Sequence, residues 1–208
     1  METLRERKKR RTREALLRAA LELFTTRGYE HTTVDEIAAA CDVSQRTFFR
    51  YFAGKEDAAF ALQERAQALF LAALRARPPH EPPMEALRQA VLEGWDAVRG
   101  NLESAVPVDL YLRMYRTIES TPALFAAHLR RSTAAEETMA RLLAEREGVD
   151  VETDPRPRLA VAVFGGVIRV TERQWCSGRD CSLEAVRKLT VSYLDQVTSA
   201  LRGNWRSA

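Results

Sequence analysis

Residues Thr32–Lys55, TTVDEIAAACDVSQRTFFRYFAGK, contain the signals for two short helices and a tight turn between them. Thr33 followed three residues later by Glu36 is a capping box, in which the hydroxyl and the carboxylate each satisfy a free backbone N–H group. This pattern predicts a helix that begins at Val34. Apolar residues then recur on one face of that helix, which we expect to end near Cys41.

A second helix is expected after a break at Asp42. Ser44 is a favourable N-cap for a helix from residue 45 to about residue 51, because its hydroxyl can accept a hydrogen bond from a free N–H group. Phe48 and Phe52 stand four residues apart and should both face inward. The side chains left on the outer face are Gln45, Arg46, Phe49 and Arg50.

This outer face has the chemistry of a DNA-binding surface. Arginine and glutamine can hydrogen-bond to guanine and adenine edges in a major groove about 12 Å wide, and aromatic side chains pack on sugar and phosphate. Lys55 follows Gly54 at the start of the next helix, where its charge and the free N–H groups can meet a phosphate. Any short amphipathic helical hairpin would show the same periodicity, but it would not need this set of outward residues.

At these residues the sequence resembles the DNA-binding domain of the TetR family of bacterial one-component transcriptional regulators. The resemblance covers roughly residues 11–57 and rests on motifs such as Arg27-Gly28-Tyr29, Thr47-Phe48-Phe49 and Lys55-Glu56. It implies phosphate contacts at Thr33, Thr47, Phe49, Tyr51 and Lys55 and base contacts at Gln45 and Arg46. With the N-cap Ser44 and the outward-facing Arg50, the candidate DNA-binding set is Thr33, Ser44, Gln45, Arg46, Thr47, Phe49, Arg50, Tyr51 and Lys55.

The chain departs from the family pattern at two of these positions. The family most often has tyrosine where this chain has Phe49, and phenylalanine has no hydroxyl to donate to a phosphate. Tyr51 stands where the family commonly has histidine. We expect Tyr51 to supply the missing hydroxyl nearby.

Length and composition place the chain in the class of intracellular proteins. The 208 residues are 46% hydrophobic, which suits one small and one medium domain, expected at residues 1–55 and 56–208. No apolar run is long enough for a membrane span, and the basic N-terminus is not followed by a signal-peptide core, so we expect a cytoplasmic protein. The three cysteines form no CxxC pair, and we expect neither a metal nor a cofactor. A redox pair of Cys176 and Cys181 is an alternative role for two of them.

Positive charge is concentrated at the N-terminal end. Residues 1–55 contain twelve Lys and Arg against eight Asp and Glu, whereas the whole chain has a net charge of only +3. Seven of the twelve lie between residues 5 and 13. Two interpretations stay open, a disordered solvated tail or a segment that follows the DNA backbone or enters a minor groove.

The rest of the sequence has helical periodicity throughout, so the predicted fold class is all-α. Proline and glycine positions predict helices at residues 55–76, 84–99, 107–118, 122–147, 157–177 and 182–201. The last two helices are apolar on broad faces, and the TetR resemblance implies that they form a four-helix homodimer interface. Packing on the chain's own core is the alternative. The candidate interface residues are Val163, Val167, Val170, Val186, Leu189, Tyr193, Leu194 and Val197.

The middle of the chain has enough large side chains to line a ligand pocket. A few polar residues among them could direct a small molecule, although aromatic residues at helical spacing also occur in ordinary cores. The candidate pocket residues are Trp95, Tyr111, Met114, Tyr115, Phe125, His128, Phe164 and Trp175. These residues do not identify the chemistry of the effector.

The predicted function is ligand-responsive transcriptional regulation, with repression relieved by a small molecule. We expect a homodimer on a palindromic DNA operator, because one recognition helix contacts too few base pairs to select a site in a genome. An enzyme is disfavoured because the chain has no GxGxxG, GxxxxGK, HExxH or GxSxG motif. A scaffold protein that no longer binds DNA is the other alternative, but it would leave the outward residues of the second helix without a role.

Overall fold

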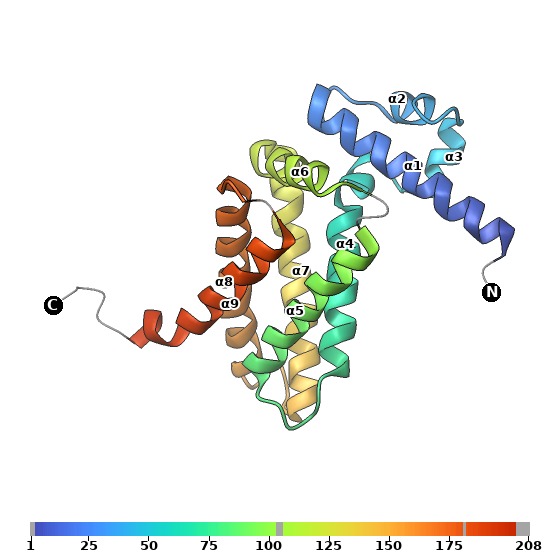
Figure 1. Cartoon of the computed structure of the whole chain (residues 1–208). Coiled ribbons are helices and arrows are strands. Elements are labelled where there is room, and N and C mark those ends of the chain that lie inside the picture. Colours follow the sequence, from blue (N-terminus) through green and yellow to red (C-terminus); the bar gives the residue numbers. More distant parts are fainter. Residues whose placement is uncertain (1–2, 103–105, 181, 203–208) are drawn as a thin grey trace. The chain divides into compact units, whose positions relative to one another are not determined.

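The structure is a computed structural model that describes residues 3–102, 106–180 and 182–202, with the side chains of residues 97–102 excepted. Helices and the loops between them make up this part of the chain (Figure 1), as the predicted all-α fold requires. The helices are α1 (Leu4–Arg27), α2 (Val34–Ala39), α3 (Gln45–Phe49), α4 (Lys55–Ala76), α5 (Pro83–Leu102), α6 (Val108–Ser120), α7 (Pro122–Glu147), α8 (Arg156–Ser177) and α9 (Leu183–Arg202). None of the helices in the described ranges is long and apolar enough to cross a bilayer.

The chain folds into two compact units. The first combines the chain up to residue 65 with residues 100–128, so it contains α1, α2, α3, the start of α4 and α6. Helix α1 packs on both α2 and α6 within this unit. Its core is made of fully buried side chains from several helices, including Leu16, Leu21, Phe24, Ile37, Phe48 and Phe60.

The second unit combines residues 66–99 with the chain from residue 129 onward. Its core joins α4, α5, α7 and α8 through Leu74, Leu87, Leu143, Val161 and Phe164, and residues of α9 pack at its edge. The rings of Phe70 and Phe164 stack at 5.7 Å between centroids. Helices α8 and α9 pack against each other. The predicted domain boundary after residue 55 stays a prediction.

Most predicted helix bounds agree with the structure, and the exceptions have local causes. Helices α4 and α7 have the predicted ends. Helix α5 continues to Leu102, so the prediction that it stops before Gly100 is wrong. A glycine inside a helix costs only about 1 kcal/mol relative to alanine, so it need not end one.

The basic N-terminal segment is helical and not a disordered tail. It forms the first turns of α1, where Thr3 and Glu6 make a second capping box. The amide and the hydroxyl of Thr3 donate to Glu6 Oε2 at 2.8 and 2.9 Å, and the amide of Glu6 donates to Thr3 Oγ1 at 3.2 Å. This cap satisfies N–H groups that would otherwise lack partners at the start of the helix.

Candidate nucleic-acid interface

Helix α2 begins at the predicted capping box. The amide of Glu36 donates to Thr33 Oγ1 at 3.2 Å, and the amide and hydroxyl of Thr33 donate to Glu36 Oε2 at 2.8 and 3.0 Å. These hydrogen bonds from Thr33 lower the pKa of Glu36. The Thr33 hydroxyl is therefore already bonded within the helix cap, although the side chain stays exposed.

The turn between α2 and α3 depends on Asp42, for which the sequence predicts only a helix break. Its φ angle is +52°, in the left-handed region that L-residues rarely adopt. Aspartate and asparagine tolerate this region better than most side chains, because their short polar groups bond locally. The amide of Val43 then donates to the carbonyl of Ala38 at 3.1 Å, which closes the turn.

Helix α3 is held by its N-cap and by two phenylalanines. The Thr47 amide donates to Ser44 Oγ at 3.2 Å, as the predicted N-cap requires. Phe48 is fully buried and Phe52 nearly so, and their ring centroids lie 5.4 Å apart. The two rings fix which side of α3 faces the protein, and the prediction that both face inward is confirmed.

The outer face of α3, made of Gln45, Arg46, Phe49 and Arg50, is open to solvent. All four side chains are exposed, and Phe49 is 51% exposed, a large value for an aromatic residue. Thr47 lies half-buried beside them. Three polar groups and one aromatic ring thus share a surface on one short, capped helix, which is the chemistry of a DNA-reading surface.

Arg50 and Tyr51 pair at the end of α3. Arg50 Nη2 donates to Tyr51 Oη at 3.3 Å, and the guanidinium carbon lies 5.0 Å from the centroid of the Tyr51 ring. The pair therefore presents a hydroxyl and a cation together next to Phe49. A phosphate oxygen could accept from both groups.

Lys55 lies half-buried at the first position of α4. Its Nζ donates to the carbonyl oxygens of Tyr29, Thr32 and Glu30 at 2.9, 3.2 and 3.5 Å and sits 4.4 Å from the centroid of the Tyr29 ring. Burial and the charge of Glu56 raise the pKa of Tyr29. The ammonium group is thus bonded to the turn before α2, an interaction that the sequence does not predict because its partners are backbone groups 23 to 26 residues away.

The candidate pocket residues are divided between the two units, and each group is described by itself. In the first unit Met114 and Tyr115 are buried, Tyr111 and Phe125 are half-buried, and His128 stacks on Phe60 with 6.4 Å between ring centroids. In the second unit the rings of Trp95 and Trp175 meet edge to face at 6.2 Å. Trp175 Nε1 donates to the Ser182 carbonyl, whereas the buried Trp95 Nε1 has no hydrogen-bond partner in the described part of the chain.

The candidate interface residues on α8 and α9 differ in how much surface they present. Val170 is 59% exposed, and Leu159, eleven residues earlier on α8, is 62% exposed. Val186 is fully buried in its own chain and has no surface to offer a partner. The remaining candidates are half-buried: Val163, Val167, Leu189, Tyr193, Leu194 and Val197.

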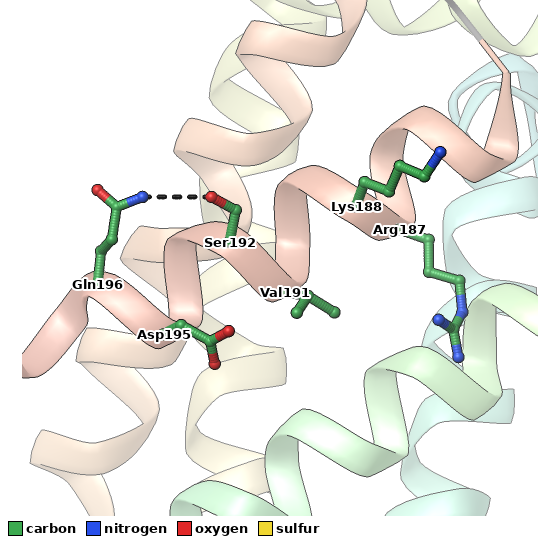
Figure 2. A pocket seen from close by; sticks show the side chains of 6 residues that line it. All are labelled: Arg187, Lys188, Val191, Ser192, Asp195 and Gln196. Atoms are coloured by element: carbon green, nitrogen blue, oxygen red, sulfur yellow. Dashed lines mark hydrogen bonds between the residues drawn. The ribbon is translucent and has the colours of Figure 1, made fainter.

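A groove of about 560 Å³ runs along α9 (Figure 2). It is lined by Arg187, Lys188, Val191, Ser192, Asp195 and Gln196, and Gln196 Nε2 donates to Ser192 Oγ at 3.2 Å. Arg187 and Asp195 also form ion pairs with Asp96 and Arg88 of α5. None of the predicted pocket residues lines this groove.

The part of the chain that the structure describes contains two of the three cysteines, Cys41 and Cys176. Cys41 is half-buried and burial raises the pKa of its thiol, which disfavours the reactive thiolate. Cys176 is buried, and Cys181 lies outside the described residues, so the alternative of a redox pair is not tested. Three or more His, Cys, Asp or Glu side chains do not gather anywhere in this part of the chain as metal ligands would.

Comparisons with known proteins agree with this arrangement. Residues 16–62 match the family of bacterial regulatory proteins called tetR, and residues 81–202 match the MftR C-terminal domain. The chain is 46% identical over 203 residues to the HTH-type transcriptional regulator TcmR of Streptomyces glaucescens, covering 98% of this chain and 90% of TcmR. It is 27% identical over 164 residues to the putative mycofactocin biosynthesis transcriptional regulator MftR of Mycobacterium tuberculosis, covering 79% of each protein.

A solved structure shares the fold as well. NalD, the secondary repressor of the MexAB-OprM multidrug efflux pump in Pseudomonas aeruginosa, superposes with a TM-score of 0.59 at 19% identity, over 92% of this chain and 96% of NalD.

Proposed function

The chain belongs to the TetR family of bacterial regulatory proteins and is a DNA-binding transcriptional regulator, and we propose that it represses transcription as a homodimer that a small molecule releases from a palindromic operator. It is a regulator and not an enzyme, as its domains and relatives indicate. We place this activity in the cytoplasm, where the chromosome is.

The observation that carries the proposal is the exposed outer face of α3. Gln45 and Arg46 occupy its first turn, where side chains of a recognition helix reach base edges in the major groove. Phe49 and the Arg50–Tyr51 pair lie beside them and support contacts to sugar and phosphate. Base contacts then give sequence preference, and the neighbouring contacts give orientation on the duplex.

Two copies of α3 are needed for useful selectivity. In a two-fold dimer the two recognition helices enter successive major grooves about 34 to 36 Å apart, which requires a palindromic site. Leu159, Val163, Val167 and Val170 share one side of α8 and are exposed or half-buried, and a contiguous apolar surface of this kind supports an interface there. A dimer bound over a promoter blocks polymerase without any further surface.

Release by a small molecule follows from linkage. A ligand that favours a dimer with differently spaced recognition helices weakens DNA binding, and DNA weakens ligand binding by the same factor, typically about 1–3 kcal/mol. The edge-to-face pair of Trp95 and Trp175, with the unpartnered indole N–H of Trp95, supports a largely apolar ligand that carries a hydrogen-bond acceptor. In this mechanism helix α4 transmits the ligand-induced change to the recognition helix, since α4 starts at the helix-turn-helix and ends in the second unit.

The DNA-binding part is tested with the full-length protein. Selection from a random duplex library should recover a palindrome, and a gel shift should show that DNA flanking the protein's own gene contains it. Sedimentation of the complex should give two chains per duplex. Equal affinity for the selected duplex and for random DNA would reject sequence-specific regulation.

The effector part is tested by tryptophan fluorescence. The variant Trp205→Phe leaves Trp95 and Trp175 as the emitters. A compound that binds beside this pair should change the emission and, at the same concentrations, release the selected duplex. Compounds that release DNA without changing the emission would place the effector site away from these tryptophans.

A further inference from the structure

The first three turns of α1 form a helical extension ahead of the helix-turn-helix. We call residues 4–15 the N-terminal extension. The first buried side chain of α1 is Leu16, and ten of the twelve residues before it in the helix are exposed. The family match also begins at residue 16. At 1.5 Å per residue the extension is about 18 Å long, and Figure 1 shows α1 reaching beyond α2 and α3 at this end.

The extension carries a high positive charge on all its sides. It has seven basic residues, Arg5, Arg7, Lys8, Lys9, Arg10, Arg11 and Arg13, against Glu6 and Glu14. The Glu6 carboxylate accepts a hydrogen bond from the Thr3 amide in the helix cap, and Glu14 Oε1 lies 3.8 Å from Arg10 Nε. At 100° per residue these seven positions encircle the helix. An apolar face of the kind that docks on a membrane or in a protein groove is therefore missing from the extension.

This charge works against the helix that carries it. Positive side chains near a helix N-terminus oppose the helix dipole, and like charges three or four residues apart, such as Arg7 with Arg11 and Lys9 with Arg13, repel each other. The extension has no buried apolar side chain that compensates for this cost. A polyanion along the helix would neutralise the charges and remove both penalties.

From these observations we propose that the N-terminal extension binds the phosphate backbone next to each operator half-site as an intact helix. The proposal rests on the function proposed above and adds a second contact region to it. An α-helix with its side chains is about 10–12 Å wide, whereas the minor groove of B-DNA is about 6 Å wide. The extension therefore follows the sugar-phosphate backbone and does not enter the minor groove.

The contact with the rest of its unit fixes where the extension can reach. The guanidinium carbon of Arg13 lies 5.0 Å from the centroid of the Phe52 ring, next to the end of α3. Residues 4–12 continue beyond this point on the same rigid helix. Binding there lengthens the DNA footprint and adds affinity and salt dependence, but it adds no base preference.

The test compares two charge-matched triple variants of the full-length protein. One carries Arg7→Gln, Lys8→Gln and Arg11→Gln in the extension, and the control carries Arg75→Gln, Arg130→Gln and Arg179→Gln at other exposed positions. The probe is the duplex selected by the wild-type protein, made either flush with the selected bases or with flanks of about ten base pairs, one helical turn, on each side.

The wild type and the control should bind the flanked duplex more tightly than the flush one, and the extension variant should not show this preference. Its slope of log K against log salt should fall by about 0.9 for each phosphate that it no longer neutralises, or roughly 2 to 5 for a dimer. Its preference for the selected bases over random DNA should stay unchanged. Equal slopes and equal preferences for the flanked duplex in the two variants would overturn the proposal.

A second pair of variants tests whether the extension must be helical. Thr12→Pro keeps every charge but interrupts the helix, whereas Thr12→Ala keeps the helix and removes a methyl group and the hydroxyl that donates to the Lys8 carbonyl. The proline variant should bind the flanked and flush duplexes equally, and the alanine variant should still prefer the flanked one. If both prefer the flanked duplex, the extension binds as a flexible arm and the helical proposal is wrong. Failure of the wild type itself to prefer the selected duplex would instead reject the proposed function.

Folding should be unaffected by these changes, because the substituted residues contribute nothing to the core. The glutamine variant should melt at the temperature of the wild type or slightly above it, because the removed charges repel one another. A lower melting temperature for the glutamine variant would contradict the proposal, since it would show that these side chains stabilise the free protein.

Discussion

Lys55 of α4 is bonded to Tyr29 in the turn before α2. Its Nζ donates to the Tyr29 carbonyl at 2.9 Å and lies 4.4 Å from the centroid of the Tyr29 ring, with the Thr32 carbonyl at 3.2 Å. A single ammonium group thus joins the start of α4 to the segment that positions α2 and α3. This relationship gives Lys55 a structural role besides the phosphate contact that the TetR resemblance implies.

We predict that Lys55→Met destabilises the protein. The change leaves carbonyl oxygens without a charged donor, and such hydrogen bonds are worth about 1.5–3 kcal/mol each, so we expect a decrease of that order in the free energy of chemical unfolding. DNA affinity should fall for all sequences together with stability. Tyr29→Leu, which keeps the carbonyl and removes the ring, should lower the free energy of unfolding by less than Lys55→Met does. Unchanged stability with a flatter salt dependence of DNA binding would show instead that Lys55 leaves the turn to contact phosphate.

We predict that Arg46→Ala removes a base contact. Affinity for the selected duplex should fall by about 1–3 kcal/mol with relaxed preference at one position of each half-site. Affinity for random DNA should change little, because Arg46 is not assigned a phosphate contact. The matched control is Arg75→Ala, an exposed arginine in the second unit. An equal decrease on selected and random DNA would contradict the assignment.

The left-handed backbone at Asp42 should control the stability of the turn. Asp42→Val should lower the free energy of unfolding by about 1–2 kcal/mol, because a β-branched side chain clashes with the backbone at φ +52°. Asp42→Gly should be neutral or stabilising at the same position, since glycine adopts this conformation freely. Denaturant unfolding of both variants measures the difference. Similar stabilities would mean that the turn can adopt another conformation.

Dimerisation should depend on the exposed apolar residues of α8. Val170→Arg should leave the single chain folded, because this side chain is 59% exposed, but it should place a cation in the proposed interface. We expect monomers in sedimentation and no operator binding. Leu129→Arg on α7, a position that is 47% exposed, is the control and should stay dimeric. An intact dimer of the Val170 variant would move the interface elsewhere.

Stability should fall in acid partly through Asp154. The side chain and amide of Arg156 donate to this carboxylate and lower its pKa to about 2. Because the ordinary value is about 3.9, the stabilisation is complete above that pH and is lost as the pH falls towards 2. Asp154→Asn should therefore melt earlier than the wild type at pH 7, and the difference should vanish near pH 2. A constant difference over this range would exclude the titration of Asp154 as its cause.

The helix-turn-helix could be predicted from sequence because its signals act over a few residues. A capping box needs only Thr33 and Glu36, an N-cap needs Ser44 and the next turn, and the inward side of α3 follows from the spacing of Phe48 and Phe52. Each of these features is repeated in the structure. The exposed outer face of α3 follows from the same spacing, so the sequence alone predicts which side chains lie on it.

Long-range relationships could not be read in this way, since they depend on backbone groups that carry no residue-specific signal. The carbonyls that bind Lys55 belong to a turn more than twenty residues earlier, and any residue there would present the same oxygen atoms. Burial likewise depends on the packing of whole helices. The apolar stripe of α9 includes both Val186, which is fully buried in its own chain, and the exposed Leu201. Periodicity places apolar residues on one side of a helix, but which of them the chain itself covers depends on where its other helices pack.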